Sequence, residues 1–415
     1  MVSVLAEGMG EKESKFRGGF RAVPPQVKAV IWLTSFAGLG VGYLITYMAA
    51  YLPEIGLSSG DVGLIIGVMS VAAMVAAIPL GLLSDRIGRK KVLLFALAPF
   101  PAILFGFALT TELWALLALA VMAGISEGAF LTAWNALIAD QTTLENRNPA
   151  FALSFIVNAS ATGIGAALPF FFPFIEDALG WSSEAVHSMA FIVIGLVCII
   201  PPLGVFLELR GYHERVREKS QKHQMLQGRT KQNLIRFSLI NALIGLGAGF
   251  IISLIPTWLF LRYEVPDSYS GPLIAISSIT MAFASLASTR IAFRYGPVKA
   301  ITLTQGISTI FLVMIPLVPG AALASVAFII RSMFMNMSAP IADSYLMGII
   351  SKEDRGVASA INNIIWRLPN SITTIFGGML LAAGFYDLPF YITTVCYVTA
   401  ITSFYLLFKN VKPES

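Results

Sequence analysis

Residues 81–91 read Gly-Leu-Leu-Ser-Asp-Arg-Ile-Gly-Arg-Lys-Lys and join two long apolar runs, residues 61–83 and 91–110. An α-helix needs about 20 apolar residues to cross the hydrocarbon core of a bilayer, so this stretch is expected to link two membrane spans. Gly81 allows two helices to approach closely, and Gly88 permits a tight turn. Asp85, at a helix end, can meet the positive N-terminus of another helix. A cytoplasmic position would account for the basic residues of this stretch. It would not account for Asp85 or for the two glycines.

The composition assigns the whole chain to the membrane. Of the 415 residues, 56% are hydrophobic and 12% are charged, whereas a soluble domain carries about 25% charged residues. Such a chain has too few polar side chains to cover a surface in water, while a bilayer accepts an apolar exterior. The polar residues 1–26 do not have the pattern of a cleavable signal peptide.

Charged residues, glycines and prolines divide the apolar sequence into twelve predicted spans. These are residues 28–51, 61–83, 91–110, 113–138, 151–172, 186–207, 235–260, 271–289, 297–316, 320–342, 357–381 and 388–408. We therefore expect an all-α integral membrane protein with twelve transmembrane helices.

Basic residues predict the orientation. With a cytoplasmic N-terminus, all of the 28 Lys and Arg lie on the inner side except Arg262, Arg331 and Arg367. This is the positive-inside pattern, and it predicts a multi-pass protein of the cell membrane with both termini cytoplasmic. The net charge of +5 then faces the anionic inner leaflet, and nucleic acid is not expected as a partner.

The two halves of the chain are repeats. Gly38-Leu39-Gly40-Val41-Gly42 returns as Gly245-Leu246-Gly247-Ala248-Gly249, and Ile138-Ala139-Asp140 returns as Ile341-Ala342-Asp343. The offsets of 207 and 203 residues keep nearly one register across several spans, which predicts two pseudo-symmetric six-helix bundles. The predicted parts are a tail at 1–27, a first bundle at 28–209, a cytoplasmic linker at 210–233, a second bundle at 234–408 and a tail at 409–415.

The stretch at 81–91 closely resembles the loop-2/3 motif of the major facilitator superfamily, Gly-x-Leu-(Ser/Ala)-Asp-Arg-x-Gly-Arg-(Arg/Lys). The resemblance in span number, linker and repeats covers residues 28–408. It implies a gating motif made of Gly81, Asp85, Arg86, Gly88, Arg89 and Asp140. In the family, Asp85 would meet the start of span 11, near Gly356, and Arg89 would pair with Asp140. The second copy carries Phe293 where the Asp would stand, so the gate is expected to be asymmetric.

Three ionisable residues lie deep inside spans: Glu127, Arg331 and Arg367. Each is 12 or 13 residues from a charge at the inner face, which places it near mid-depth at about 1.5 Å per residue. A charge there costs on the order of 2.5–3.5 kcal/mol, so a function or an ion pair must offset it. If the family fold holds, Glu127 and Arg331 occupy nearly equivalent positions facing one central axis. Glu127 is then the candidate proton site, and the arginines suit a carboxylate or phosphate of the solute.

Polar and aromatic side chains supply further candidates for the solute site. Asn363, Arg367 and Asn370 share one helical face, and Asn158 lies on a weaker polar stripe. Tyr43, Tyr47 and Trp134 are candidate cavity walls, together with Phe130. Hydrogen bonding between helices explains the stripes equally well, and packing explains the aromatics.

The sequence predicts a secondary active transporter of a small organic solute that works by alternating access, with protons as a candidate coupling ion. A facilitative uniporter, a drug or metabolite exporter and, less favoured, a non-transporting sensor remain alternatives. No enzyme is expected, since no His and no paired acids lie mid-span. No metal site or cofactor is expected, and we expect a monomer in the lipid bilayer. Leu168 replaces a family Gly before Pro169, and span 1 has no acidic residue, so drug/proton antiport does not transfer directly.

Overall fold

A computed structural model of the chain describes residues 20–143, 146–211, 228–350 and 355–411. The first half contains α2 (Pro25–Thr46), η1 (Tyr47–Tyr51), α3 (Leu52–Glu54), α4 (Ser59–Ile87), α5 (Arg89–Leu97), α6 (Phe100–Leu109), α7 (Leu113–Asp140), α8 (Arg147–Ala167), η2 (Leu168–Phe171), α9 (Phe172–Leu179), α10 (Ser183–Val197) and α11 (Ile200–Glu208). The second half contains α12 (Gly228–Ile251), η3 (Ile252–Leu254), α13 (Ile255–Tyr263), α14 (Asp267–Tyr295), α15 (Pro297–Met314), α16 (Ala321–Gly348), α17 (Arg355–Ala382) and α18 (Leu388–Phe408).

These elements join into twelve long helical segments. Among the described residues, ten segments are long and apolar enough to cross a membrane. The other two, α14 and α17, have 29 and 28 residues and are also long enough. The structure confirms the predicted all-α membrane protein. The second half begins at Gly228, inside the predicted linker 210–233, and the rest of that linker lies largely outside the described residues.

Side-chain caps and glycines determine where helices begin and end. The Ser58 hydroxyl accepts a hydrogen bond from the Asp61 backbone N–H at 3.1 Å and caps α4. Gly88 ends α4 with φ +104°, and Gly296 ends α14 with φ +77°, a backbone conformation that favours glycine. Helix α4 is longer than predicted, so Asp85 and Arg86 lie in its last turns and the connection to α5 is a single residue.

The repeat is visible in the packing of α2 and α12. A Cβ added at Gly38 would meet the Asn158 carbonyl oxygen on α8 at 3.4 Å, and one added at Gly245 would lie much closer still to the Trp366 carbonyl oxygen on α17. Both leading helices then lose regular geometry at equivalent places, in η1 and η3. The two halves therefore have the same internal architecture, as the sequence repeat predicts.

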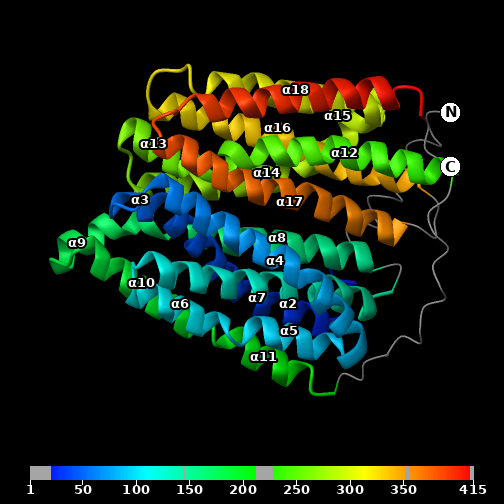
Figure 1. Ribbon diagram of the computed structural model, residues 1–415. Helices are drawn as coiled ribbons and strands as arrows, with labels where there is room; N and C mark the ends of the chain where they lie inside the picture. The colour runs from blue at the N-terminus through cyan, green and yellow to red at the C-terminus, as the bar shows by residue number, and fades with distance from the viewer. Residues whose placement is uncertain (1–19, 144–145, 212–227, 351–354, 412–415) are drawn as a thin grey trace.

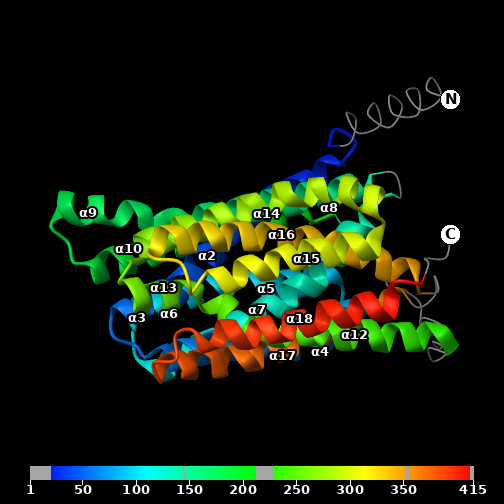
Figure 2. The ribbon, with the colours of Figure 1, turned by 90° about the horizontal axis from the view of Figure 1, so that it is seen from above.

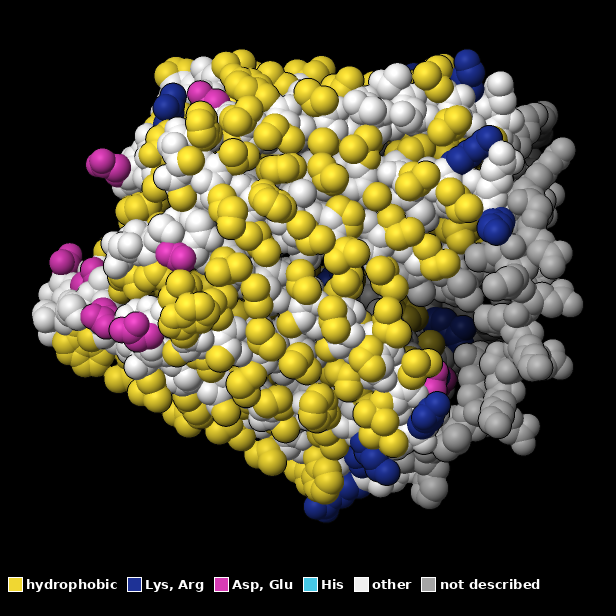
Figure 3. Space-filling view, in the orientation of Figure 1, with side chains coloured by type: hydrophobic (Ala, Val, Ile, Leu, Met, Phe, Trp, Pro, Cys, Tyr) yellow, Lys and Arg dark blue, Asp and Glu magenta, His cyan; other side chains and the backbone are white. Residues whose placement is uncertain are grey.

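The helices run along one common axis in both ribbon views (Figures 1 and 2). We call the end where α2 begins and α18 ends the tail end. The opposite end, which contains α3, α9 and α13, is called the far end (Figure 1). On the face drawn in Figure 3, Asp and Glu gather at the far end and most Lys and Arg at the tail end. The helices between are covered with hydrophobic side chains, as a lipid-facing surface requires.

The two bundles touch most closely at the far end. A Cβ added at Gly63 on α4 would lie 2.8 Å from the Thr374 carbonyl oxygen and 2.9 Å from the Gly378 Cα, both on α17. The Thr257 hydroxyl on α13 donates a hydrogen bond to the Ala49 carbonyl oxygen at 2.5 Å. Toward the tail end the surface is hollowed between the bundles (Figure 3). The described residues therefore form a structure that is sealed at the far end.

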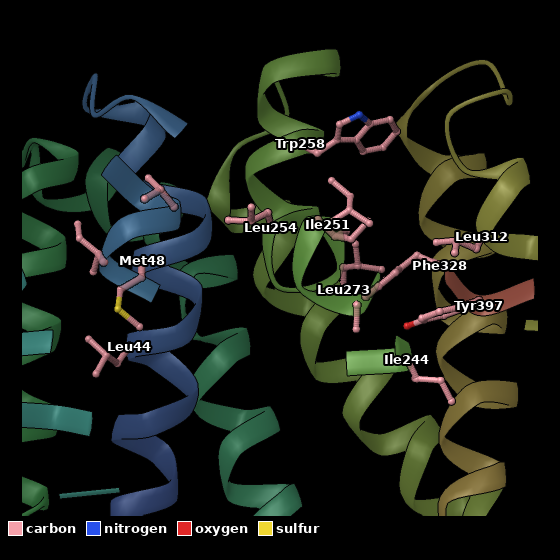
Figure 4. Packing of buried hydrophobic residues seen from close by; sticks show 14 of the residues in the cluster. Leu44, Met48, Ile244, Ile251, Leu254, Trp258, Leu273, Leu312, Phe328 and Tyr397 are labelled. Atoms are coloured by element: carbon pink, nitrogen blue, oxygen red, sulfur yellow. The ribbon is translucent and has the colours of Figure 1, made fainter. Parts of the chain in front are cut away.

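Buried hydrophobic side chains pack along the length of each bundle, from the tail end to the far end. In the second bundle Ile251, Trp258 and Leu273 lie together, and in the first Leu44 and Met48 line one side of α2 and η1 (Figure 4). All five side chains are at least 96% buried.

Candidate substrate cavity and gating motif

A cavity of about 670 Å³ lies mainly inside the first bundle. Its walls come from α2, α4, α5, α6, α7 and α8, and among the described residues the second bundle adds Ser278 and Met281 from α14. The size suits a small organic molecule. Glu127 on α7 is the one ionisable residue among the described residues that line it.

Glu127 forms an ion pair across the two bundles. Its Oε1 lies 3.3 Å from Nη1 of Arg367 on α17, and both side chains are 39% exposed. The sequence predicted mid-depth charges, and the structure brings these two together. Because the pair joins the two bundles beside the cavity, a proton or a solute that neutralises either partner would weaken a contact between them.

Aromatic and amide side chains cover the cavity wall between Glu127 and the tail end. The Phe130 and Trp134 rings stack with centroids 5.5 Å apart, and both line the cavity. Trp134 Nε1 donates to Ser154 Oγ at 2.9 Å, and Asn158 Nδ2 donates to the Ser154 carbonyl oxygen at 2.9 Å. The wall therefore offers flat apolar surface and a few fixed polar groups, as predicted for Trp134 and Asn158.

Arg331 does not face Glu127, contrary to the sequence expectation. Its side chain is buried within the second bundle, where Nη2 donates a hydrogen bond to the Tyr397 hydroxyl at 2.7 Å. The guanidinium also lies over the Tyr397 ring, 5.6 Å from its centroid. Arg331 lies well inside α16, and this helix turns the side chain toward α18.

Tyr43 and Tyr47 also lie away from the cavity, contrary to the suggestion that they wall it. Both are buried among aromatic rings at the far end, and Tyr43 bonds His187 Nδ1 at 2.8 Å. His187 was not singled out by the sequence. The available signal was a histidine inside a predicted apolar span that has no other charged residue.

The polar stripe of α17 makes contacts both within its own bundle and to the other bundle. Asn370 Nδ2 donates to the Gly245 carbonyl oxygen on α12 at 3.3 Å, so this residue joins helices of one bundle. Asn363 is exposed and has a polar partner of its own. Neither residue is among those that line the cavity, and Arg367 is the member of the stripe that reaches the other bundle.

The gating motif is partly assembled. Arg89 Nη1 forms an ion pair with Asp140 Oδ2 and donates to the Ala136 carbonyl oxygen at 2.7 Å. This ties the start of α5 to the end of α7. Asp85 is exposed at the end of α4, and its predicted partner Gly356 lies outside the residues whose surroundings are described. Gly81 is not a point of closest approach, because an added Cβ would meet Thr132 at an ordinary 3.6 Å.

We expect Asp85→Asn to slow transport at least tenfold while the protein stays folded. The exposed carboxylate is free to latch the tail end when the bundles close there, and a latch contact of about 1–3 kcal/mol biases the two states. Arg89→Ala and Asp140→Ala should each slow transport, and the double variant should be no slower than either single one. Lys91→Ala, an exposed neighbour, is the control. Wild-type flux in Asp85→Asn would rule out the latch.

Two six-helix bundles with an apolar outer surface, a largely apolar cavity inside the first of them and an ion pair between the two are the features of a multi-pass membrane transporter. The chain belongs to the Major Facilitator Superfamily, whose sequence model matches residues 30–374.

Two similar proteins carry the same family character. The chain is 27% identical over 166 residues to the quinolone resistance protein NorA of Staphylococcus aureus, and the match covers 39% of each chain. It is 26% identical over 271 residues to an MFS-type transporter of Methanocaldococcus jannaschii, covering 61% of this chain and 65% of the relative. The matched segments thus span less than two thirds of these relatives.

Solved structures share the fold at low sequence identity. A bacterial homolog of the human lysosomal transporter Spinster, in an inward-facing unoccupied conformation, superposes with a TM-score of 0.69 at 17% identity. The match covers 92% of this chain and 97% of the other. The nucleoside transporter NupG has a TM-score of 0.70 at 16% identity, covering 92% and 99% of the two chains.

Proposed function

We propose that this protein is a secondary active transporter that moves a small, amphiphilic organic solute across the cell membrane by alternating access. The observation that carries this proposal is the cavity of about 670 Å³ whose wall holds Glu127, the carboxylate that pairs with Arg367 of the other bundle. A solute bound there contacts the interface that must rearrange when the protein changes state. Glu127 serves as the proton-coupling site, because it can exchange a proton or release Arg367.

The cavity wall supports an amphiphilic rather than a simple anionic solute. Phe130, Trp134 and Phe155 supply apolar surface, and the described lining carries a carboxylate but no basic residue. Arg331 is buried elsewhere, and Arg367 already faces a carboxylate. These contacts suit a flat apolar body with a polar or cationic group.

Export is the second candidate, favoured by the likeness to NorA, a quinolone resistance protein, over 166 residues. We propose that the tail end faces the cytoplasm, because the basic residues gather there (Figure 3). The structure then corresponds to a state that accepts solute from the cytoplasm. Labelling of a single cysteine at Ser415 by an impermeant thiol reagent in intact cells would contradict this orientation.

A proteoliposome experiment tests the function. The purified chain is reconstituted with or without a pH gradient and offered a cationic aromatic dye, a sugar and an amino acid. We expect the dye to move against its concentration gradient, with a rate that rises at least tenfold when the gradient is imposed. Sugar or amino-acid flux without dye flux would overturn the solute class. Equal dye flux with and without the gradient would overturn the coupling.

A further inference from the structure

A buried histidine and a buried carboxylate face each other across the two bundles at the far end. His187 on α10 and Asp267 at the start of α14 are 2% and 7% exposed, and Nε2 lies 3.3 Å from Oδ2. Neither atom has a hydrogen bond to another described residue. Burying a carboxylate without a partner is costly, so the opposite charge of an imidazolium is the natural partner here.

Each ring nitrogen of His187 faces an oxygen atom. The Tyr43 hydroxyl lies 2.8 Å from Nδ1 and 3.2 Å from the His187 carbonyl oxygen. When Tyr43 donates its single proton to that carbonyl, its oxygen accepts from a protonated Nδ1, and Nε2–H is left for Asp267. The Tyr51 ring stacks on the imidazole with centroids 3.5 Å apart, which favours a cation.

Asp267 is part of a wider seam between the bundles. The Glu54 carboxylate on α3 accepts a hydrogen bond from the Asp267 backbone N–H. An anion at this position stabilises the first turn of α14. Asp267 therefore contacts two elements of the first bundle, α10 and α3, and separation of the bundles must break both contacts.

The seam carries several acidic groups, so one proton added at His187 changes its charge balance. The titratable groups that face His187 or its partner from the packed elements are Tyr43, Tyr47, Tyr51, Glu54, Glu176, Glu184 and Asp267. Four of these are carboxyl groups, and His187 is the one group in the set that can carry positive charge. Without that charge, the buried Asp267 carboxylate has lost its opposite charge, which favours opening.

We propose that His187 and Asp267 form a proton-binding site at the far-end seam, distinct from Glu127, and that a proton bound there holds the far end closed. The proposal rests on the proposed alternation between two states, but not on Glu127 as the coupling site. Histidine is the side chain that ordinarily changes charge between pH 5 and 8. The imidazolium–carboxylate attraction is therefore present at low pH and lost as the pH rises. Acid on the far side thus favours the state that is open at the tail end.

Distances between spin labels on the full chain test the proposal. The labels are placed by Glu112→Cys in the first bundle and Arg262→Cys in the second, both exposed at the far end, after Cys198→Ala and Cys396→Ala. We expect the ratio of open to closed far ends to rise at least tenfold between pH 5 and pH 8. His187→Gln should reduce this change to less than twofold, and Asp267→Asn should do the same.

The other two histidines of the chain, His213 and His223, provide the matched control. His213→Gln with His223→Gln should keep the full pH response. If Asp267→Asn or His187→Gln fails to fold, Tyr43→Phe supplies the third variant, and it should weaken the response. A full response in any folded seam variant, whether His187→Gln, Asp267→Asn or Tyr43→Phe, would overturn the proposal. A far end that opens equally at both pH values would overturn the proposal but leave alternation standing, whereas a far end that never opens would overturn both.

Discussion

Glu127→Gln is expected to abolish accumulation of solute driven by a pH gradient, while exchange of solute without a gradient continues within about threefold of wild type. Glutamine has nearly the same shape and still accepts a hydrogen bond from Arg367, but it cannot gain or lose a proton. The 3.3 Å contact across the bundles therefore keeps its geometry but can no longer respond to a proton. Uptake in proteoliposomes, with and without the gradient, separates the two quantities.

Glu112→Gln is the matched control, because Glu112 is exposed at the far-end start of the same helix, α7. It should behave as wild type in both assays. Arg367→Gln combined with Glu127→Gln should remain uncoupled, since it restores charge balance but not a proton site. Wild-type accumulation by Glu127→Gln would remove Glu127 from the mechanism.

Gly63→Leu is expected to lower transport at least 30-fold without unfolding either bundle. The nearest atoms to a Cβ at Gly63 all belong to α17, in the other bundle, and lie 2.8–3.2 Å away. They are backbone atoms, which cannot move aside as a side chain can. The substitution therefore blocks closure of the far end, and a shift of about 2 kcal/mol between the two states is enough for an effect of this size.

Gly306→Ala on α15 is the control, because an added Cβ there meets nothing within 4 Å. Gly128→Leu gives the contrast, since its neighbours on α4 belong to the same bundle and the change should lower thermal stability and expression. Gly63→Leu should therefore lower the transport rate, whereas Gly128→Leu should lower the melting temperature. Wild-type transport in Gly63→Leu would show that the far-end contact need not form.

Hydrophobic length and glycine spacing were enough to predict the helices and the repeat. Twelve runs of apolar residues specify twelve helices, because a bilayer leaves few alternatives for an apolar chain. Gly42 and Gly249 mark equivalent close contacts, since an added Cβ at each would clash with a backbone carbonyl of a neighbouring helix. Such patterns can be read from the sequence because they are local or because they occur in both halves of the chain.

The partners of the charges inside the spans were not predictable in the same way. The sequence placed Glu127, Arg331 and Arg367 well inside long helices, but position along a helix does not give the direction in which a side chain points about the helix axis. Arg331 could face Glu127 or Tyr397, depending on the rotation of α16 about its axis. Tertiary packing determines that rotation, and Arg331 bonds Tyr397. The seam of His187 and Asp267 joins residues 80 positions apart in different bundles, so it could be found in the structure and not in a motif.

The most direct test of alternating access is a pair of distance measurements on one preparation. Labels at Glu112→Cys and Arg262→Cys report the far end, and labels at Lys91→Cys and Phe293→Cys, both exposed, report the tail end. Pulsed dipolar spectroscopy in lipid nanodiscs should give two distances at each end, and conditions that lengthen the far-end distance should shorten the tail-end one in the same proportion of molecules. Two ends that open and close independently, or a single fixed distance at each, would contradict the account.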